Sequence, residues 1–235
     1  MIPELGQIAL LIAFMLAVVQ GVMPLVGAHR NDSVWMQVAR PAAFAQFGFV
    51  AIAFGILTSA FINNDFSLQY VASNSNTALP LMFRVAAVWG AHEGSMLLWI
   101  LILSTWTIAV AFGSRSLPEP VAARVIGVLG LLSVGTLAFT LFTSNPFLRL
   151  DIAPVDGRDL NPLLQDPALV IHPPMLYIGY VGLSVAFAFA IAAMLSGELD
   201  RQWARWTRPR TTAAWVFLPL GIAQGCWWAY YELRR

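Results

Sequence analysis

The sequence predicts an all-α fold, a polytopic membrane bundle of about six transmembrane helices that forms one domain over residues 1–235. Composition is the first reason. The chain is 59% hydrophobic and only 11% charged, whereas soluble domains carry about 25% charged residues. Continuous apolar runs are the second reason, since runs of roughly 18 or more residues read as membrane-spanning helices. We place these runs at about residues 5–28, 41–62, 86–113, 121–143, 170–195 and 211–231.

The arginines predict the orientation of this bundle, because all thirteen basic residues are arginine. Eight of them lie in or beside three loops, at about 29–40, 114–124 and 196–210. The positive-inside rule places these loops in the cytoplasm. Both termini and the loops 63–85 and 144–169 then face the periplasm of a bacterium, and the chain is expected in the inner membrane. The eight are Arg30, Arg40, Arg115, Arg124, Arg201, Arg205, Arg208 and Arg210, and the others are Arg84, Arg149, Arg158, Arg234 and Arg235.

The first, second and fourth runs contain few side chains suited to ligand binding or catalysis. His29 ends the first run beside Arg30 and is interpreted as an interfacial histidine. The second run has scattered small residues, which allow helices to pack closely in lipid. The fourth run is rich in Gly, Leu and Val and is interpreted as scaffold.

The third run is different, because it contains the ionisable residues His92 and Glu93. Charges inside a membrane cost about 2.5–3.5 kcal/mol each on insertion scales, so such residues should face protein or water. Two interpretations stay open. Either His92 ends an aromatic wall for a flat ligand, or this is a packed helix face in which His92 and Glu93 satisfy each other or backbone groups. Helical spacing places on one arc Trp89, His92, Met96, Trp99, Leu103 and Trp106, with Gly90 and Gly94 on a separate packing seam.

The fifth run follows a polar, proline-rich loop and begins near His172, Pro173 and Pro174. Proline is tolerated in a first helical turn, where its missing N–H has no partner. We therefore expect His172 at the mouth of a membrane helix. Arg149 and Arg158 in the preceding loop are available to a ligand carboxylate, or to the aspartates beside them.

The sixth run gathers four aromatic residues at its outer end. An interfacial aromatic belt is the default explanation, and a ligand shelf is the alternative. Together with the two outer histidines and the arginines, these rings suit haem, because iron takes imidazole nitrogen and propionates attract arginine. The four residues are Trp227, Trp228, Tyr230 and Tyr231.

Three segments also resemble the haem-lyase subunit of the cytochrome c maturation system, the CcmF family. They are WGAHEGSMLLW (89–99), DGRDLNPLLQDPALVIHPPMLYIGY (156–180) and LGIAQGCWWAYYEL (220–233). The resemblance implies that haem b, the transferred substrate, is taken from a periplasmic haem chaperone and joined through its vinyl groups to apocytochrome c. It implies that His172 ligates the haem iron, and it places His92 and Glu93 in a signature helix without a defined role.

The resemblance also implies that the chain corresponds to an N-terminal portion of the family. The Trp-rich WWD motif and a second haem histidine lie further along in the family, so the protein is expected to be naturally split or a fragment, and to be part of a haem lyase rather than active alone. Expected partners are the C-terminal half, the haem chaperone, apocytochrome c and a thiol-reducing or apocytochrome-presenting subunit, but no nucleic acid. The sequence fits equally well a specialised paralogue of this family that matures a single cytochrome.

Three other functions are compatible with a helical membrane bundle to different degrees. A b-type haem electron-transfer subunit needs paired histidines on facing helices, and only His92 and His172 could form one. A transporter often shows inverted repeats, which are not visible here. A non-catalytic scaffold for the maturation complex remains open.

The single cysteine, Cys226, excludes an intrachain disulfide, and the lack of a CxxCH motif excludes a haem attached covalently to this chain.

Overall fold

The computed structural model describes residues 1–197 and 201–232, and this part of the chain is helical apart from loops and one isolated bridge between Leu68 and Arg149. The predicted all-α membrane-type fold is confirmed. Arg234 and Arg235 of the sequence prediction lie outside the described residues. The long helices are α1 (Ile2–Arg30), α3 (Ala39–Ile62), α6 (His92–Gly113), α7 (Glu119–Thr143), α8 (Pro167–Ser196) and α9 (Arg201–Glu232). The short ones are α2 (Ser33–Gln37), α4 (Gln69–Asn74), α5 (Leu81–Ala87), η1 (Ser114–Ser116) and η2 (Pro162–Leu164).

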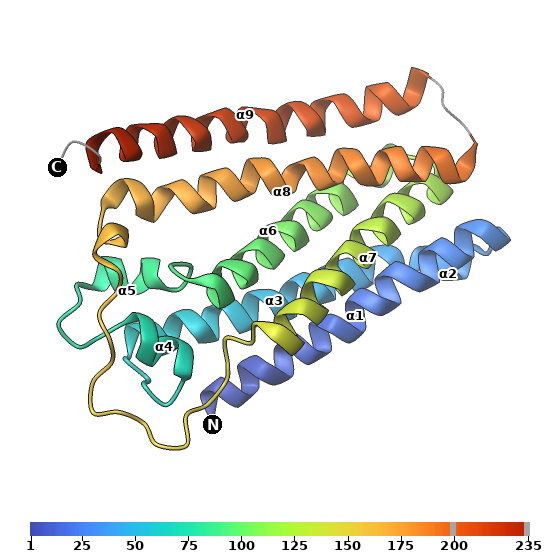
Figure 1. The fold of residues 1–235 in the computed structure, drawn as a ribbon. Helices are drawn as coiled ribbons and strands as arrows, with labels where there is room; N and C mark the ends of the chain where they lie inside the picture. Colours follow the sequence, from blue (N-terminus) through green and yellow to red (C-terminus); the bar gives the residue numbers. More distant parts are fainter. Residues whose placement is uncertain (198–200, 233–235) are drawn as a thin grey trace.

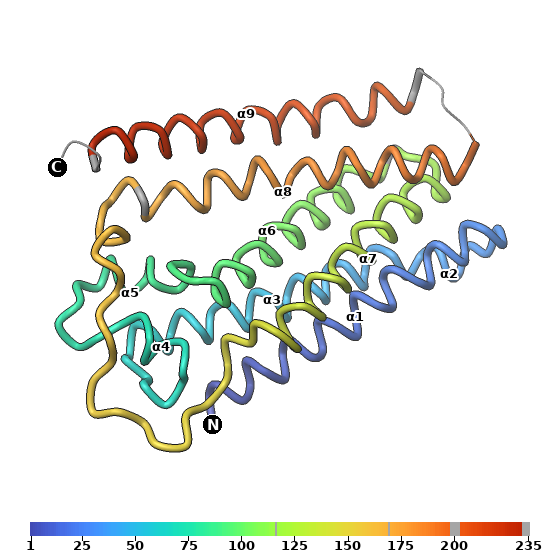
Figure 2. The backbone as a smooth tube through the Cα atoms, in the orientation of Figure 1, coloured from blue at the N-terminus to red at the C-terminus, as the bar shows by residue number. Residues whose placement is uncertain are grey.

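The long helices pack side by side (Figure 1). Helix α1 packs on α3 and α7, α6 packs on α3, α7 and α8, and α9 packs mainly on α8. Figure 2 shows that α8 and α9 run antiparallel, and that the last turns of α9 lie at the same end of the bundle as the first turns of α1. We call this end, with α4, α5 and residues 144–166, the outer end. The opposite end, where α1 and α8 end and α7 begins, is the inner end. Which side of a membrane each end faces remains a prediction.

Within the described residues, five helical segments are long and apolar enough to cross a membrane: Ile2–Arg30, Ser33–Ile62, His92–Gly113, Glu119–Thr143 and Val170–Ser196. The sixth predicted run, 211–231, lies within α9, which is not among them. Helix α9 begins at Arg201 and includes an Arg- and Trp-rich first half, which makes it more polar than the others. Its 32 residues span about 48 Å, which exceeds the ~30 Å hydrocarbon core.

The third predicted helix starts later than expected. Instead of one helix from about residue 86, α5 ends at Ala87 and α6 begins at His92, with a non-helical break over residues 88–91. The predicted arc and packing seam are therefore wrong for Trp89 and Gly90, which lie outside α6. Gly94 allows the break, because a Cβ there would lie 1.6 Å from the Val88 carbonyl oxygen.

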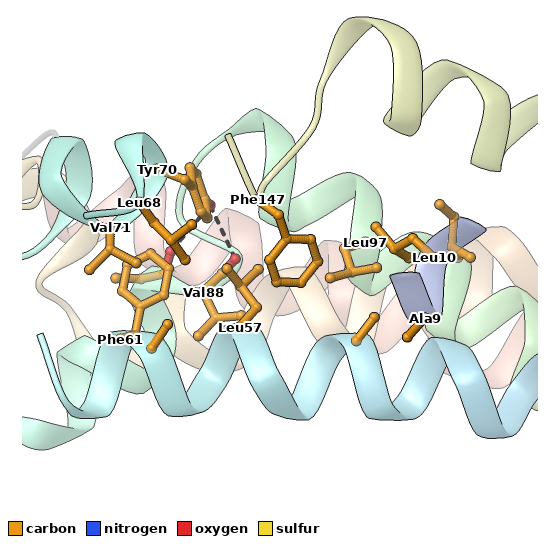
Figure 3. Close-up of a cluster of buried hydrophobic side chains, with 14 of the residues drawn as sticks. Ala9, Leu10, Leu57, Phe61, Leu68, Tyr70, Val71, Val88, Leu97 and Phe147 are labelled. Carbon is orange, nitrogen blue, oxygen red and sulfur yellow. Dashed lines mark hydrogen bonds between the residues drawn. The ribbon is translucent and has the colours of Figure 1, made fainter. Parts of the chain in front are cut away.

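Tyr70 of α4 holds this break from the outer side. Its hydroxyl donates to the Val88 carbonyl oxygen at 3.1 Å (Figure 3). The same hydroxyl accepts from the Ala91 N–H at 3.2 Å. Burial raises the pKa of Tyr70, so the hydroxyl keeps the proton that it donates. The ring packs edge-to-face on Phe61, with centroids 5.3 Å apart. Through this buried cluster the outer loops are fixed to the bundle.

Helix α8 starts earlier than expected. Asp166 is its N-cap and accepts the Ala168 N–H at 2.7 Å, and Pro167 occupies the first turn. Asp followed by Pro is a favourable helix start. Pro173 and Pro174 consequently lie inside the helix, and the expectation that they occupy its first turn beside His172 is wrong. His172 lies in the second turn.

Candidate functional site

His172 points from α8 towards α9. Its Nδ1 lies 2.8 Å from the carbonyl oxygen of Gly221. A carbonyl oxygen only accepts hydrogen bonds, so Nδ1 carries the hydrogen and donates it. In the neutral ring, the lone pair is then on Nε2. Histidines that bind metals commonly use this arrangement, in which the bond at one nitrogen orients the other.

Glycines bring α8 and α9 close enough for this contact. A Cβ on Gly225 would lie 2.6 Å from Cε1 of His172, and a Cβ on Gly221 would lie 2.7 Å from the Cα of Leu176. Gly179 of α8 would meet the Leu218 nitrogen at 2.3 Å in the same way. Small residues at such seams let helix backbones approach. The imidazole is thus half-buried in a seam that larger residues would close.

Trp89 in the break is tied to the start of α8. Its indole Nε1 donates to the Val170 carbonyl oxygen at 3.2 Å. In a regular helix that carbonyl accepts from the residue four positions later, but here this residue is Pro174, which has no N–H. The indole therefore satisfies an acceptor that the proline leaves open, two residues before His172.

A cavity of about 340 Å³ lies between the break and the start of α8. Its volume is at the lower end of the range for ligand sites, about 300–1,000 Å³. It accommodates the edge of a flat ligand rather than a whole macrocycle. His172 does not line it, because the ring faces α9. The lining residues include Trp89, His92, Leu160, Leu164, Pro173 and Tyr177.

His92 lies at the same end but faces a different helix. Its Nδ1 is 2.9 Å from the Ser144 hydroxyl, and its ring packs edge-to-face on Phe139 with centroids 5.8 Å apart. Phe139 lies near the end of α7, and Ser144 is the C-cap of that helix. His92 thus finds its partner in Ser144 rather than in Glu93, which is half-buried. The structure does not bring His92 and His172 together as a facing pair.

The predicted aromatic residues occupy different environments. Trp99 is half-buried and packs against the hydrophobic core. Trp227 is 56% exposed on α9 and contacts the ring of Tyr231. Trp228 is half-buried, and its Nε1 is buried without a hydrogen-bond partner. Their roles in a haem site stay predictions.

The two arginines predicted to bind a ligand, Arg149 and Arg158, also lie in different environments. Arg149 forms an ion pair with Glu4, Nη2 to Oε1 at 2.6 Å, and also donates a hydrogen bond to the Ser67 hydroxyl. Its guanidinium is therefore engaged with Glu4 and Ser67 and not with the neighbouring aspartates. Arg158 is exposed, and its backbone N–H donates to the Ala72 carbonyl oxygen. Within the described residues its guanidinium has no hydrogen bond or ion pair.

Sequence reasoning missed several residues that shape the site. Gly221 and Gly225 have the four-residue spacing of a close helix seam, and this signal was available. Tyr70 and Ser144 offered no such signal, because their contacts come from distant parts of the chain. Among the described residues no three His, Cys, Asp or Glu side chains form a metal cluster.

The cytochrome c assembly protein family matches residues 89–233, more than half of the chain. The chain belongs to this family. The matched part of this cytochrome c assembly protein begins at the break before α6. It includes His92, His172 and the Gly221–Gly225 seam, whereas α1 to α5 precede it.

Individual relatives agree with this assignment and confirm the resemblance predicted from the three motifs. The cytochrome c-type biogenesis protein CcmF of Pseudomonas aeruginosa is 63% identical over 234 residues, which cover 99% of this chain and 36% of the relative. The cytochrome c-type biogenesis protein ccl1 of Rhodobacter capsulatus is 59% identical over 233 residues, with coverages of 99% and 36%. A solved structure of a cytochrome c heme lyase CcmF has a TM-score of 0.86 and 30% identity, and the match covers 98% of this chain and 36% of that one.

The chain therefore spans about a third of the length of the relatives it matches. With the five apolar helices found in its described part, it is a multi-pass membrane protein.

Proposed function

We propose that this chain acts in cytochrome c maturation, as the part of a haem lyase that supplies His172 as one axial ligand of the haem iron. One observation carries the proposal. The bond from Nδ1 of His172 to the Gly221 carbonyl oxygen leaves Nε2 as the nitrogen with a lone pair. Iron in haem proteins is commonly held by imidazole nitrogen. The names of the relatives, a biogenesis protein and a heme lyase, support the same role.

The work of this chain is then positioning. The seam at Gly221 and Gly225 fixes the imidazole plane, and Trp89 fixes the first turns of α8 that carry it. Arg158, which is exposed, is available to a propionate. Haem itself supplies the vinyl groups, across which the thiol S–H of a reduced apocytochrome adds. Holding both reactants in one geometry is the main contribution of a protein to such a step.

The remaining assignments follow from the same proposal. Haem b is the substrate, received at the periplasmic face of a bacterial inner membrane from a haem chaperone. Apocytochrome c arrives through a thiol-reducing or apocytochrome-presenting subunit. The segment that corresponds to the rest of the relatives supplies the second axial ligand.

The test uses this chain together with that segment, purified as one complex. We expect His172→Ala to abolish most haem binding, measured as the ratio of haem absorbance to protein. His29→Ala is the matched control, because His29 is an exposed histidine at the inner end and should leave the ratio unchanged. His172→Gly with added imidazole should regain haem, which a purely structural role of His172 does not predict. An unchanged haem content in His172→Ala contradicts the proposal.

A b-type electron-transfer subunit is less well supported. It requires two histidines that face one haem, and His92 and His172 are directed towards α7 and α9 respectively. A bis-histidine haem spectrum from this chain alone would favour that alternative.

A further inference from the structure

A second site lies at the inner end, far from the histidine seam. A cavity of about 440 Å³ opens where α1 and α8 end and α7 begins. We call it the Arg124 notch. Helices α1 and α8 each pack on α7, so three helices build its walls. Its lining residues are Leu25, Val26, His29, Arg30, Arg124 and Leu195.

The notch is basic at its mouth. Arg30 and His29 are exposed on the last turn of α1, and Arg124 is half-buried on α7. One nitrogen of Arg124, Nη2, donates to the Ala28 carbonyl oxygen at 3.2 Å. Within the described residues its remaining N–H groups have no hydrogen bond or ion pair. A half-buried guanidinium with free donors is a ready partner for an anion.

The described carboxylates near this end are engaged elsewhere. Asp32 accepts the N–H groups of Val34 and Trp35, and Glu119 accepts the hydroxyl of Ser33. Among the described residues, no carboxylate lines the notch. Arg124 also lines a neighbouring cavity of about 400 Å³, so its guanidinium lies between two recesses.

The other half of the lining is apolar. Leu25, Val26 and Leu195 lie next to the cations, and Leu195 is 58% exposed. These helix ends are the ends of membrane-spanning segments, so the notch is at the level where lipid headgroups meet acyl chains. A free phosphate ion needs the cations but gains nothing from the apolar wall. A phospholipid gains from both, since its acyl chain covers the wall.

We propose that the Arg124 notch binds the phosphate headgroup of an anionic membrane phospholipid. Basic pockets between membrane helices are suited to such headgroups. Arg124 and Arg30 contact the phosphate oxygens, and the aliphatic side chains contact the first part of an acyl chain. The site is independent of the haem proposal, because it shares no residue with it.

The experiment is native mass spectrometry of the purified chain, with phosphatidylglycerol and phosphatidylcholine offered in equal amounts. We expect the protein to retain phosphatidylglycerol preferentially. Arg30→Gln and Arg124→Gln should each weaken retention roughly fivefold to tenfold, as expected for one lost cation–phosphate contact. Arg208→Gln is the matched control, since Arg208 is exposed on the first half of α9 and does not line the notch.

Three results overturn the proposal: equal retention of the two lipids, an equal loss of retention in Arg208→Gln, or displacement of the lipid by millimolar inorganic phosphate. The last result would identify a free-anion site instead. Arg124→Gln removes a bond to α1 and can disturb folding. The side chain of Arg30 makes no described hydrogen bond, so Arg30→Gln tests the site in a folded protein.

Discussion

The starts of α6 and α8 offer an instructive comparison, because each carries a histidine at the outer end. His92 contacts the hydroxyl of Ser144, which either donates or accepts, so this contact leaves the tautomer of His92 open. His172 contacts the carbonyl of Gly221, which only accepts, so its Nε2 carries the lone pair. Two histidines near the starts of neighbouring helices therefore differ as possible ligands because the fold gives their rings different hydrogen-bond partners.

The greatest loss of stability is expected from a substitution at Gly94, near the start of α6. Gly94→Ala places a Cβ against the Val88 carbonyl oxygen, which is backbone and cannot rotate away. We expect a loss of roughly 3 kcal/mol or more in the free energy of unfolding, because overpacking here forces backbone movement. Denaturant unfolding in detergent measures it. Gly48→Ala is the control, since a Cβ there meets no atom within 4 Å. Equal stability of both variants would show that the break is not tightly packed.

A second substitution tests whether the glycine seam between α8 and α9 orients His172. Gly225→Ala should push the imidazole of His172 away from Gly221 and cost about 2 kcal/mol of stability. Nitrogen NMR of the ring should then show loss of the fixed Nδ1–H tautomer. Gly135→Ala on α7, where a Cβ also meets nothing within 4 Å, serves as control. A ring with an unchanged tautomer in Gly225→Ala would mean that the seam does not orient His172.

The link between the two helix starts gives a smaller effect. Trp89→Phe removes the donor to the Val170 carbonyl oxygen and should cost about 1 kcal/mol in the free energy of unfolding, since that acceptor then lacks a partner. The cost should shrink when Pro174→Ala restores an N–H to the helix. A double-mutant cycle measures this coupling.

Trp99→Phe is the control for this cycle, because the indole of Trp99 makes no described hydrogen bond. Additive effects of Trp89→Phe and Pro174→Ala would contradict the role given to the indole.

The smallest effect concerns the outer loops. Hydrogen bonds from the Thr77 hydroxyl and N–H hold the pKa of Asp156 below its ordinary value of 3.8. A carboxyl with a lowered folded pKa stabilises the protein above pH ~3.8, and this contribution is lost as the pH falls through the folded value. Thr77→Val should therefore destabilise slightly at neutral pH, and the difference from the wild type should vanish in acid. A difference that is independent of pH would exclude the ionised carboxylate as its source.

Parts of the site were predictable, and the reasons are local. The runs that carry His92, His172 and the aromatic residues near 227–231 were predicted to be helical, and α6, α8 and α9 are helices. The break at residues 88–91 was not predictable, because it depends on Tyr70 from another segment and on Gly94 facing the Val88 carbonyl oxygen. The ion pair of Arg149 with Glu4 joins residues that are far apart in the sequence, so no local sequence pattern predicts it.

Hydropathy and local motifs are properties of the sequence alone, so they were enough to predict a helical membrane bundle and the resemblance to a cytochrome c maturation family. The tertiary structure decided which way each histidine faces and which nitrogen is available. The physical reason is that a hydrogen-bond partner such as the Gly221 carbonyl is a backbone group common to all residues, and only helix packing brings it to one ring.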